Sequence, residues 1–208
     1  MVIGLLAITA IPTVTGVGQA VSSQKRQNAA AKEQEKFNLT AVLLPSAEEE
    51  AEGKRRREAG FCVVGDGRLL LDVGEQQPAP AGHRFCGYHF AYPCAEGHLG
   101  LVTTVSDAPP MLHWVFVDGA TGAVRHGGRS QTLGHVIGPW GWSADEALLT
   151  LDGRAGGFVA RRDDDGLWAA HWDPDGRMLA AGEGACRPLL LRRRPLLGLE
   201  SRYVRDNA

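Results

Sequence analysis

The side chains best suited to chemistry gather in one short stretch, "HRFCGYHFAYPCAEGH", which covers residues 83–98. It holds three histidines and two cysteines, the side chains that zinc prefers in proteins. The stretch has strand composition, however, and successive side chains of a strand point to opposite faces of a sheet. Cys86 therefore lies on one face and His83 and His89 lie on the other. We expect no metal site here, and no cofactor.

The four cysteines, Cys62, Cys86, Cys94 and Cys186, leave two alternatives open. An even number permits two disulfides if the chain is secreted. In the cytoplasm the thiols would stay reduced and mostly buried. The cysteine question therefore depends on whether the N-terminal segment exports the chain.

A second unusual string is "HVIGPWGW", in which Trp140 and Trp142 flank a glycine. Two close indoles can form the wall of a pocket for a small apolar ligand. The polar groups of such a pocket would come from nearby residues, namely Arg125, His126, Arg129 and His135. The alternative, which we favour, is that both tryptophans are core or rim residues that fix a loop.

Other catalytic patterns are missing from the sequence. It contains no nucleophile elbow and no Walker or Rossmann glycine pattern. The strings "DDDG" and "DPDG" lack the ligand spacing of a calcium loop and are typical of turns. Whether the protein is an enzyme stays open at this point.

The chain from about residue 60 onward consists of short apolar runs broken by Gly, Pro and Asp. Nine or ten such runs predict a mainly β fold, an antiparallel sandwich or barrel of short strands. Gly65-Asp66-Gly67 predicts a hairpin turn, and "RMLAA" at residues 177–181 is assigned to a strand. A capping box from Ser143 to Glu146 predicts one turn of helix.

Charge divides the chain into an apolar N-terminal anchor at residues 1–22, a polar helical connector at 23–59 and a β-rich domain at 60–208. The first ionisable side chain is Lys25. A secretory signal needs positive charge before its apolar core, whereas here the basic residues follow it. The positive-inside rule places that basic flank on the cytoplasmic side of a membrane. Pro12 and several glycines make the segment a poor spanning helix.

We therefore expect an N-terminal helix that holds the β-domain at a membrane surface or a protein partner, on the cytoplasmic side. Secretion with cleavage of the segment is the alternative. A formal net charge of −2 argues against nucleic acid as a partner.

The strings "MVIGLLAITAIPTVTGVGQAVSSQKRQNAAAKEQEKFNL", "GPWGW" and "GFVARR" together resemble an uncharacterised family of proteins from filamentous ascomycete fungi. The resemblance runs along most of the chain. It implies a fungal source, where such proteins sometimes accompany secondary-metabolite genes. It implies no catalytic residues, because the family has no established activity.

Three functional readings follow. The first is a non-catalytic membrane- or partner-associated β-domain protein. The second is an accessory protein of a secondary-metabolite pathway, either a binder of a small apolar molecule or an enzyme-like protein that also turns it over by acid–base chemistry. The third is a secreted, disulfide-bonded protein.

Overall fold

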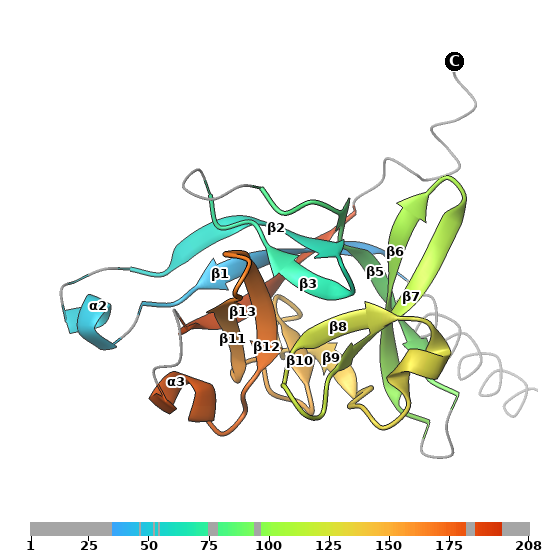
Figure 1. Ribbon diagram of the computed structural model, residues 1–208. Coiled ribbons are helices and arrows are strands. Elements are labelled where there is room, and N and C mark those ends of the chain that lie inside the picture. Colours follow the sequence, from blue (N-terminus) through green and yellow to red (C-terminus); the bar gives the residue numbers. More distant parts are fainter. Residues whose placement is uncertain are drawn as a thin grey trace, which may run out of the picture. The chain divides into compact units, whose positions relative to one another are not determined.

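The computed structural model describes residues 35–45, 47–51, 53, 55–74, 79–93, 97–181 and 186–196 (Figure 1). The N-terminal helix, the anchor at residues 1–22 and the first part of the expected connector lie outside these residues. The chain from Glu35 onward forms a unit of its own.

Thirteen strands make up most of the described chain. They are β1 (Phe37–Leu43), β2 (Arg57–Gly65), β3 (Arg68–Leu71), β4 (His83–Arg84), β5 (Cys86–Ala91), β6 (Leu99–Asp107), β7 (Pro110–Val117), β8 (Val124–Gly127), β9 (Trp140–Trp142), β10 (Leu149–Leu151), β11 (Phe158–Arg162), β12 (Trp168–Trp172) and β13 (Cys186–Pro195). Two short helices, α2 (Ala47–Ala51) and α3 (Arg177–Ala181), and a 3-10 turn, η1 (Arg129–Thr132), complete the described elements.

Nine of the strands close into an antiparallel barrel. Going round from β1, the order is β5, β6, β7, β8, β3, β12, β11 and β13, and β13 returns to β1. Strand β2 pairs with both β1 and β3. The predicted mainly β, antiparallel fold is confirmed, and a closed barrel is the form it takes.

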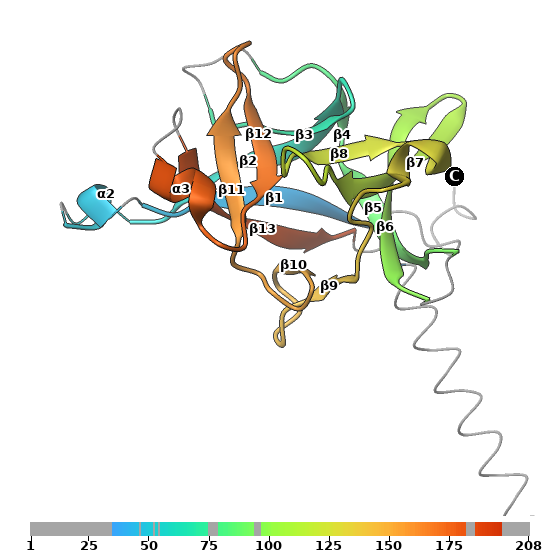
Figure 2. The same ribbon diagram turned by 60° about the horizontal axis from the view of Figure 1, so that its bottom comes forward.

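The small β9–β10 hairpin packs against one end of this barrel (Figure 2). Trp140, Leu149 and Leu151 of the hairpin are buried in the same core cluster as barrel residues such as Leu39 and Leu101. The hairpin therefore supplies large side chains that fill the interior from that end.

The predicted turn between β2 and β3 is confirmed. Gly65 pairs with Arg68, so the two central residues are Asp66 and Gly67. Both have positive φ angles, 49° and 72°. A two-residue turn of this kind matches the twist of its flanking strands, and Asp-Gly is among the sequences that adopt it most readily.

Strand β1 corrects the predicted domain boundary. It lies within residues 23–59, the expected connector, yet all seven of its residues are buried. Phe37, Leu39, Ala41 and Leu43 face the core, and the strand pairs with β13 along its whole length. The β-domain therefore begins before residue 60, at β1, because this short apolar run between two charged segments is a central strand.

The strand predicted at residues 177–181 is wrong, because this segment forms α3. The carboxylate of Asp173 accepts hydrogen bonds from the backbone N–H groups of Arg177 and Met178, each at 2.8 Å, and from that of Leu179 at 3.3 Å. A carboxylate that satisfies the free N–H groups of a first turn stabilises the start of a helix. This local cap favours a helix over the strand that the apolar residues of 177–181 suggested.

The helical turn predicted at Ser143–Glu146 is also wrong. The hydroxyl of Ser143 accepts a hydrogen bond from the backbone N–H of Leu148 at 3.0 Å. This bond bridges the connection between β9 and β10. Glu146 has a φ of 56°, in the left-handed region that a right-handed helix does not use. The segment is therefore the turn of a hairpin.

Candidate functional site

Trp140 lies in the interior. It is 2% exposed, and its ring stacks on Phe158 at a centroid distance of 6.3 Å and an angle of 12°. Its indole Nε1 is buried without a hydrogen-bond partner among the described residues. The side chain therefore fills the core and offers no exposed wall to a ligand.

Trp142 lies at the same end of the barrel and is partly exposed. Its ring meets the edges of two others, Phe37 at 4.5 Å and His89 at 4.9 Å between centroids. The guanidinium carbon of Arg193 lies 4.7 Å from the centre of the Trp142 ring. The distance is that of a cation–π contact, so Arg193 covers the aromatic group.

Arg193 is held in place by two carboxylates. Its Nη2 lies 2.8 Å from Glu35 and its Nη1 lies 3.4 Å from Glu146. Burial and the positive charge of Arg193 together lower the pKa of His89 to about 4, burial being the larger cause. His89 is therefore neutral at pH 7. Among the described residues Arg193 is the one buried Lys or Arg side chain, and both of its terminal nitrogens are paired with carboxylates.

The four polar residues predicted to complete a pocket lie on β8, on η1 and in the loop after it. Arg125 pairs with Asp118 at 3.6 Å, and the guanidinium of Arg129 donates to the carbonyl of Pro93 at 3.2 Å. His135 accepts the backbone N–H of Gly119 at 3.2 Å. Each of these three side chains thus contacts a group of a nearby loop.

His126 forms a pair with His113 of β7, with 3.0 Å between the two Nδ1 atoms. Burial lowers the pKa of His126 to about 4, helped by the charges of His113 and Arg125. The structure therefore places Trp140 and Trp142 in β9 and the four polar residues elsewhere, each with its own partner. None of the six lines either of the two clefts described below.

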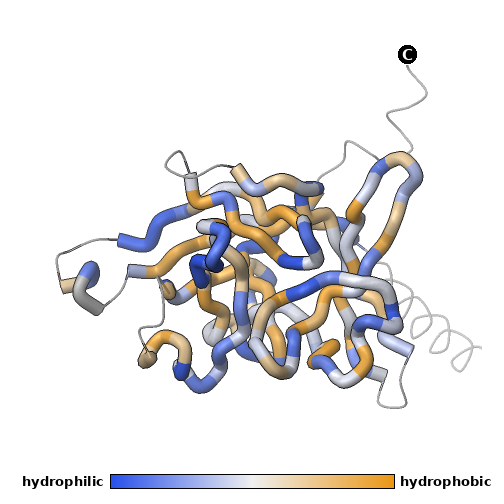
Figure 3. The backbone as a smooth tube through the Cα atoms, in the orientation of Figure 1, coloured by the Kyte–Doolittle hydropathy of each residue, from blue (hydrophilic) through white to orange (hydrophobic). Residues whose placement is uncertain are grey.

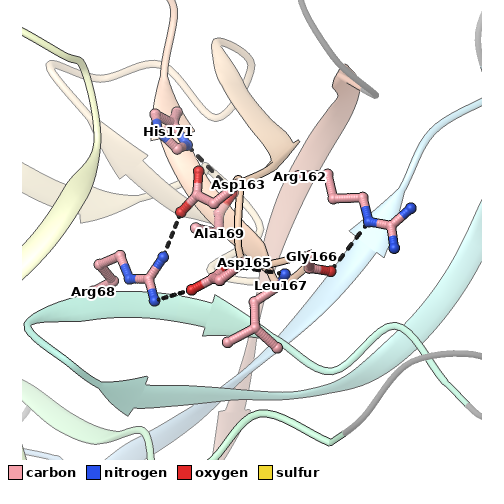
Figure 4. Close-up of polar contacts among 8 residues, drawn as sticks. All are labelled: Arg68, Arg162, Asp163, Asp165, Gly166, Leu167, Ala169 and His171. Atoms are coloured by element: carbon pink, nitrogen blue, oxygen red, sulfur yellow. Dashed lines mark hydrogen bonds and ion pairs between the residues drawn. The ribbon is translucent and has the colours of Figure 1, made fainter.

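The first cleft, of about 350 Å³, adjoins the β11–β12 turn and contains the "DDDG" string. Arg68 of β3 donates to Asp163 and to Asp165, each at 2.7 Å (Figure 4). Asp165 also accepts the N–H of Leu167 at 3.0 Å. The hydrogen bond from Arg68 is the main cause that lowers the pKa of Asp165. The carboxylates thus serve a turn and an ion-paired link to β3.

The stretch "HRFCGYHFAY" shows the expected alternation of faces. Phe85, Gly87 and His89 are buried, whereas Cys86 and Phe90 point outward. Among the residues that the structure describes, no group of three or more His, Cys, Asp or Glu side chains could hold a metal ion. Cys94 lies outside them.

The thiol of Cys62 offers little reactivity. Cys62 and Cys86 are free thiols. Complete burial raises the pKa of Cys62 to about 12, so the thiol stays protonated and is a poor nucleophile.

The outer surface of the barrel carries a group of exposed apolar side chains that no sequence pattern indicated. Phe90 of β5 and Leu112 of β7 are 46% and 50% exposed, and Trp114 of β7 lies between them. The Phe90 and Trp114 rings are 6.1 Å apart. We call these three residues the apolar stripe; it runs along the outer face of β5, β6 and β7.

The stripe ends on a projecting hairpin. The outer part of the β6–β7 hairpin extends away from the barrel (Figure 1), and Figure 3 shows hydrophobic colouring on parts of both its strands. Residues 108–112 at its end are all exposed and contain no ionisable side chain. Asp107 precedes them and pairs with His83 at 3.1 Å. Exposed apolar side chains that lie together on one face are typical of an interaction site.

No helix in the described part of the chain is both long and apolar enough to cross a membrane.

Comparison with known proteins gives one match. The model of a family described as "Fungal beta-trefoil domain" matches residues 16–195, which is well over half of the chain. No curated protein and no solved structure matches the chain. The closed antiparallel barrel with its small capping hairpin agrees with the fold in the family's description, and the expected fungal family is confirmed. The chain therefore belongs to the fungal beta-trefoil domain family.

Proposed function

We propose that the protein is a non-catalytic domain that attaches to the cytoplasmic side of a membrane through its N-terminal segment, residues 1–22, and through the apolar stripe. The observation that carries the proposal is the exposure of Phe90 and Leu112 on one outer face, beside a projecting hairpin in which residues 108–112 are exposed and carry no charge. Moving apolar side chains of this size out of water is favourable, so an exposed pair favours a binding partner that buries them.

A membrane explains the shape of this surface better than a protein partner does. The end of the hairpin projects, so a protein would need a matching hollow to receive it. The boundary of a bilayer accepts any projecting apolar group without a preformed pocket. The nearest acidic side chain, Asp107, lies beside the turn, opposite Pro110. Its carboxylate is 85% exposed and lies 3.1 Å from Nε2 of His83, its partner on β4.

The two elements would act together. The first charged side chain of the sequence is Lys25, so the N-terminal segment offers an apolar run with a basic flank. Two weak attachments in one chain reinforce each other, because once the first is bound the second is held near the membrane at high effective concentration.

Cell fractionation of the tagged full chain tests the stripe. The double variant Phe90→Ser/Leu112→Ser is expected to move from the membrane fraction to the soluble fraction. The matched control is Leu179→Ser, which removes another exposed leucine, on α3, and should leave the distribution unchanged. A double variant that sediments like the parent would show that the stripe has no part in attachment.

A second experiment tests the N-terminal segment. Deletion of Met1 to Gln19 should release the protein to the soluble fraction even with the stripe intact. Intact-mass measurement of the parent should find the segment retained. A mature N-terminus near Val21 would overturn this half of the proposal in favour of secretion.

A further inference from the structure

A second cleft, of about 340 Å³, lies at the end of the barrel away from the β6–β7 hairpin, beside α2 (Figure 1). It is lined by the end of β1, by residues leading into β2 and by the start of β13, namely Leu43, Leu44, Pro45, Arg55, Arg57 and Arg187. Glu49 of α2 is the one acidic residue among the described residues of the lining. Three guanidinium groups against one carboxylate leave the cleft positively charged. Figure 3 shows the hydrophilic colouring at the start of β2.

Two of the three guanidinium groups are fixed by the protein. Nη2 of Arg57 donates to the carbonyl of Val73 at 2.8 Å. Gly74, the next residue, has a φ of 106°, a backbone conformation that favours glycine, and the Arg57 guanidinium lies against it. Arg57 is thereby held with its other N–H groups unused by this contact.

Arg187 is fixed from the opposite side of the cleft. Its two terminal nitrogens meet the two carboxylate oxygens of Glu49 at 3.1 and 3.2 Å. This two-point contact sets the plane of the guanidinium. A group that is already oriented loses less conformational entropy when it binds a ligand.

The rest of the lining is apolar. Leu43 is buried, and Leu44 and Pro45 are half-buried beside it. A fully hydrated inorganic ion makes no favourable contact with such a surface. An anion attached to a hydrocarbon can bury it against the hydrocarbon. The volume lies at the lower end of the range for small-molecule sites.

We infer that this cleft binds a soluble phosphate monoester with a short apolar tail, the phosphate lying between Arg55, Arg57 and Arg187. The planar guanidinium fork matches phosphate oxygens in pairs, which favours a phosphate over a single-point anion. The apolar lining contacts the tail. This inference is independent of membrane attachment, because the cleft and the stripe lie at opposite ends of the domain.

Titration calorimetry of the full chain with hexyl phosphate tests the site. We expect one site per chain, and at least tenfold weaker binding of inorganic phosphate, which lacks the tail. Arg55→Gln should weaken the binding of hexyl phosphate about tenfold or more. The matched control is Arg56→Gln, which removes the same charge from the next residue and should change the affinity less than about twofold, because Arg56 does not line the cleft.

Arg187→Gln should also weaken binding at least tenfold, and thermal melting shows whether that variant is folded. Arg55 is exposed and makes no contact within the core, so its variant stays informative in either case. Vesicles that contain phosphatidic acid should not compete with hexyl phosphate. The inference is overturned if hexyl phosphate gives no binding at millimolar concentration, if Arg55→Gln and Arg56→Gln weaken it equally, or if only the vesicles bind.

Discussion

The guanidinium carbon of Arg193 lies 4.7 Å from the centre of the Trp142 ring. Through this contact a buried, carboxylate-paired cation covers the aromatic group at one end of the barrel. Trp140, two residues away, lies beneath it in the core. Two tryptophans that the sequence offered as a pocket wall are thus parts of the packing between the β9–β10 hairpin and the barrel.

Trp140→Ala should therefore cost about 3–5 kcal/mol in the free energy of unfolding, because it removes a fully buried aromatic ring. Trp142→Ala should cost less, because this ring is partly exposed. Urea denaturation of both variants measures the change, with Leu179→Ala as an exposed control expected to stay within about 0.5 kcal/mol of the parent. Two tryptophan variants as stable as the parent would contradict the structural role.

His89 should make the protein less stable in acid. Its pKa is about 4 in the folded state, against about 6.5 in an unfolded chain. The unfolded state therefore takes up a proton first, so stability is complete above pH 6.5 and falls as the pH drops toward 4. The loss for this one group is about 3 kcal/mol at most. His126, whose pKa is lowered in the same direction, adds to it.

The check is the free energy of unfolding measured between pH 7 and pH 4.5. His89→Gln should flatten the pH dependence, because glutamine does not titrate in this range. Leu179→Gln, at an exposed residue of α3 that does not titrate, should keep the dependence of the parent. A parent-like slope in His89→Gln would exclude His89 as the source.

The link between Arg68 and Asp163 should stabilise the fold modestly. Both side chains are 21% exposed, so the pair is partly screened by water. A double-mutant cycle with Arg68→Met and Asp163→Asn should give a coupling energy of about 1 kcal/mol, decreasing at high salt. A coupling that is near zero at low salt would show that the Arg68–Asp163 pair does not stabilise the fold.

Local turn chemistry was the part of the fold most accessible from the sequence. Asp66-Gly67 specifies its hairpin by itself, since both residues tolerate positive φ. Alternation placed His89 and Cys86 on opposite faces for the same local reason. Repeated short apolar runs with such turns were enough to predict an antiparallel β fold.

Features that depend on tertiary neighbours were not accessible. All seven residues of β1 are buried and the strand pairs along its whole length with β13, at the far end of the described chain, so its short apolar run looked like part of a connector. The cap of α3 is a different case, because the Asp173 carboxylate that accepts its first N–H groups is a local signal, four residues before Arg177, which the apolar composition of residues 177–181 outweighed in the strand prediction. In the apolar stripe, Leu112 shows the same alternation as a core residue, because periodicity does not distinguish the outer face of a barrel from the inner one.

The most direct test of membrane attachment is photocrosslinking in intact cells, with a photoreactive amino acid at position 112 of the full chain. The same residue at position 179, on α3, is the control. The proposal predicts lipid adducts from position 112 and few or none from position 179. Equal lipid adducts from both positions, or adducts from position 112 with soluble proteins alone, would contradict it.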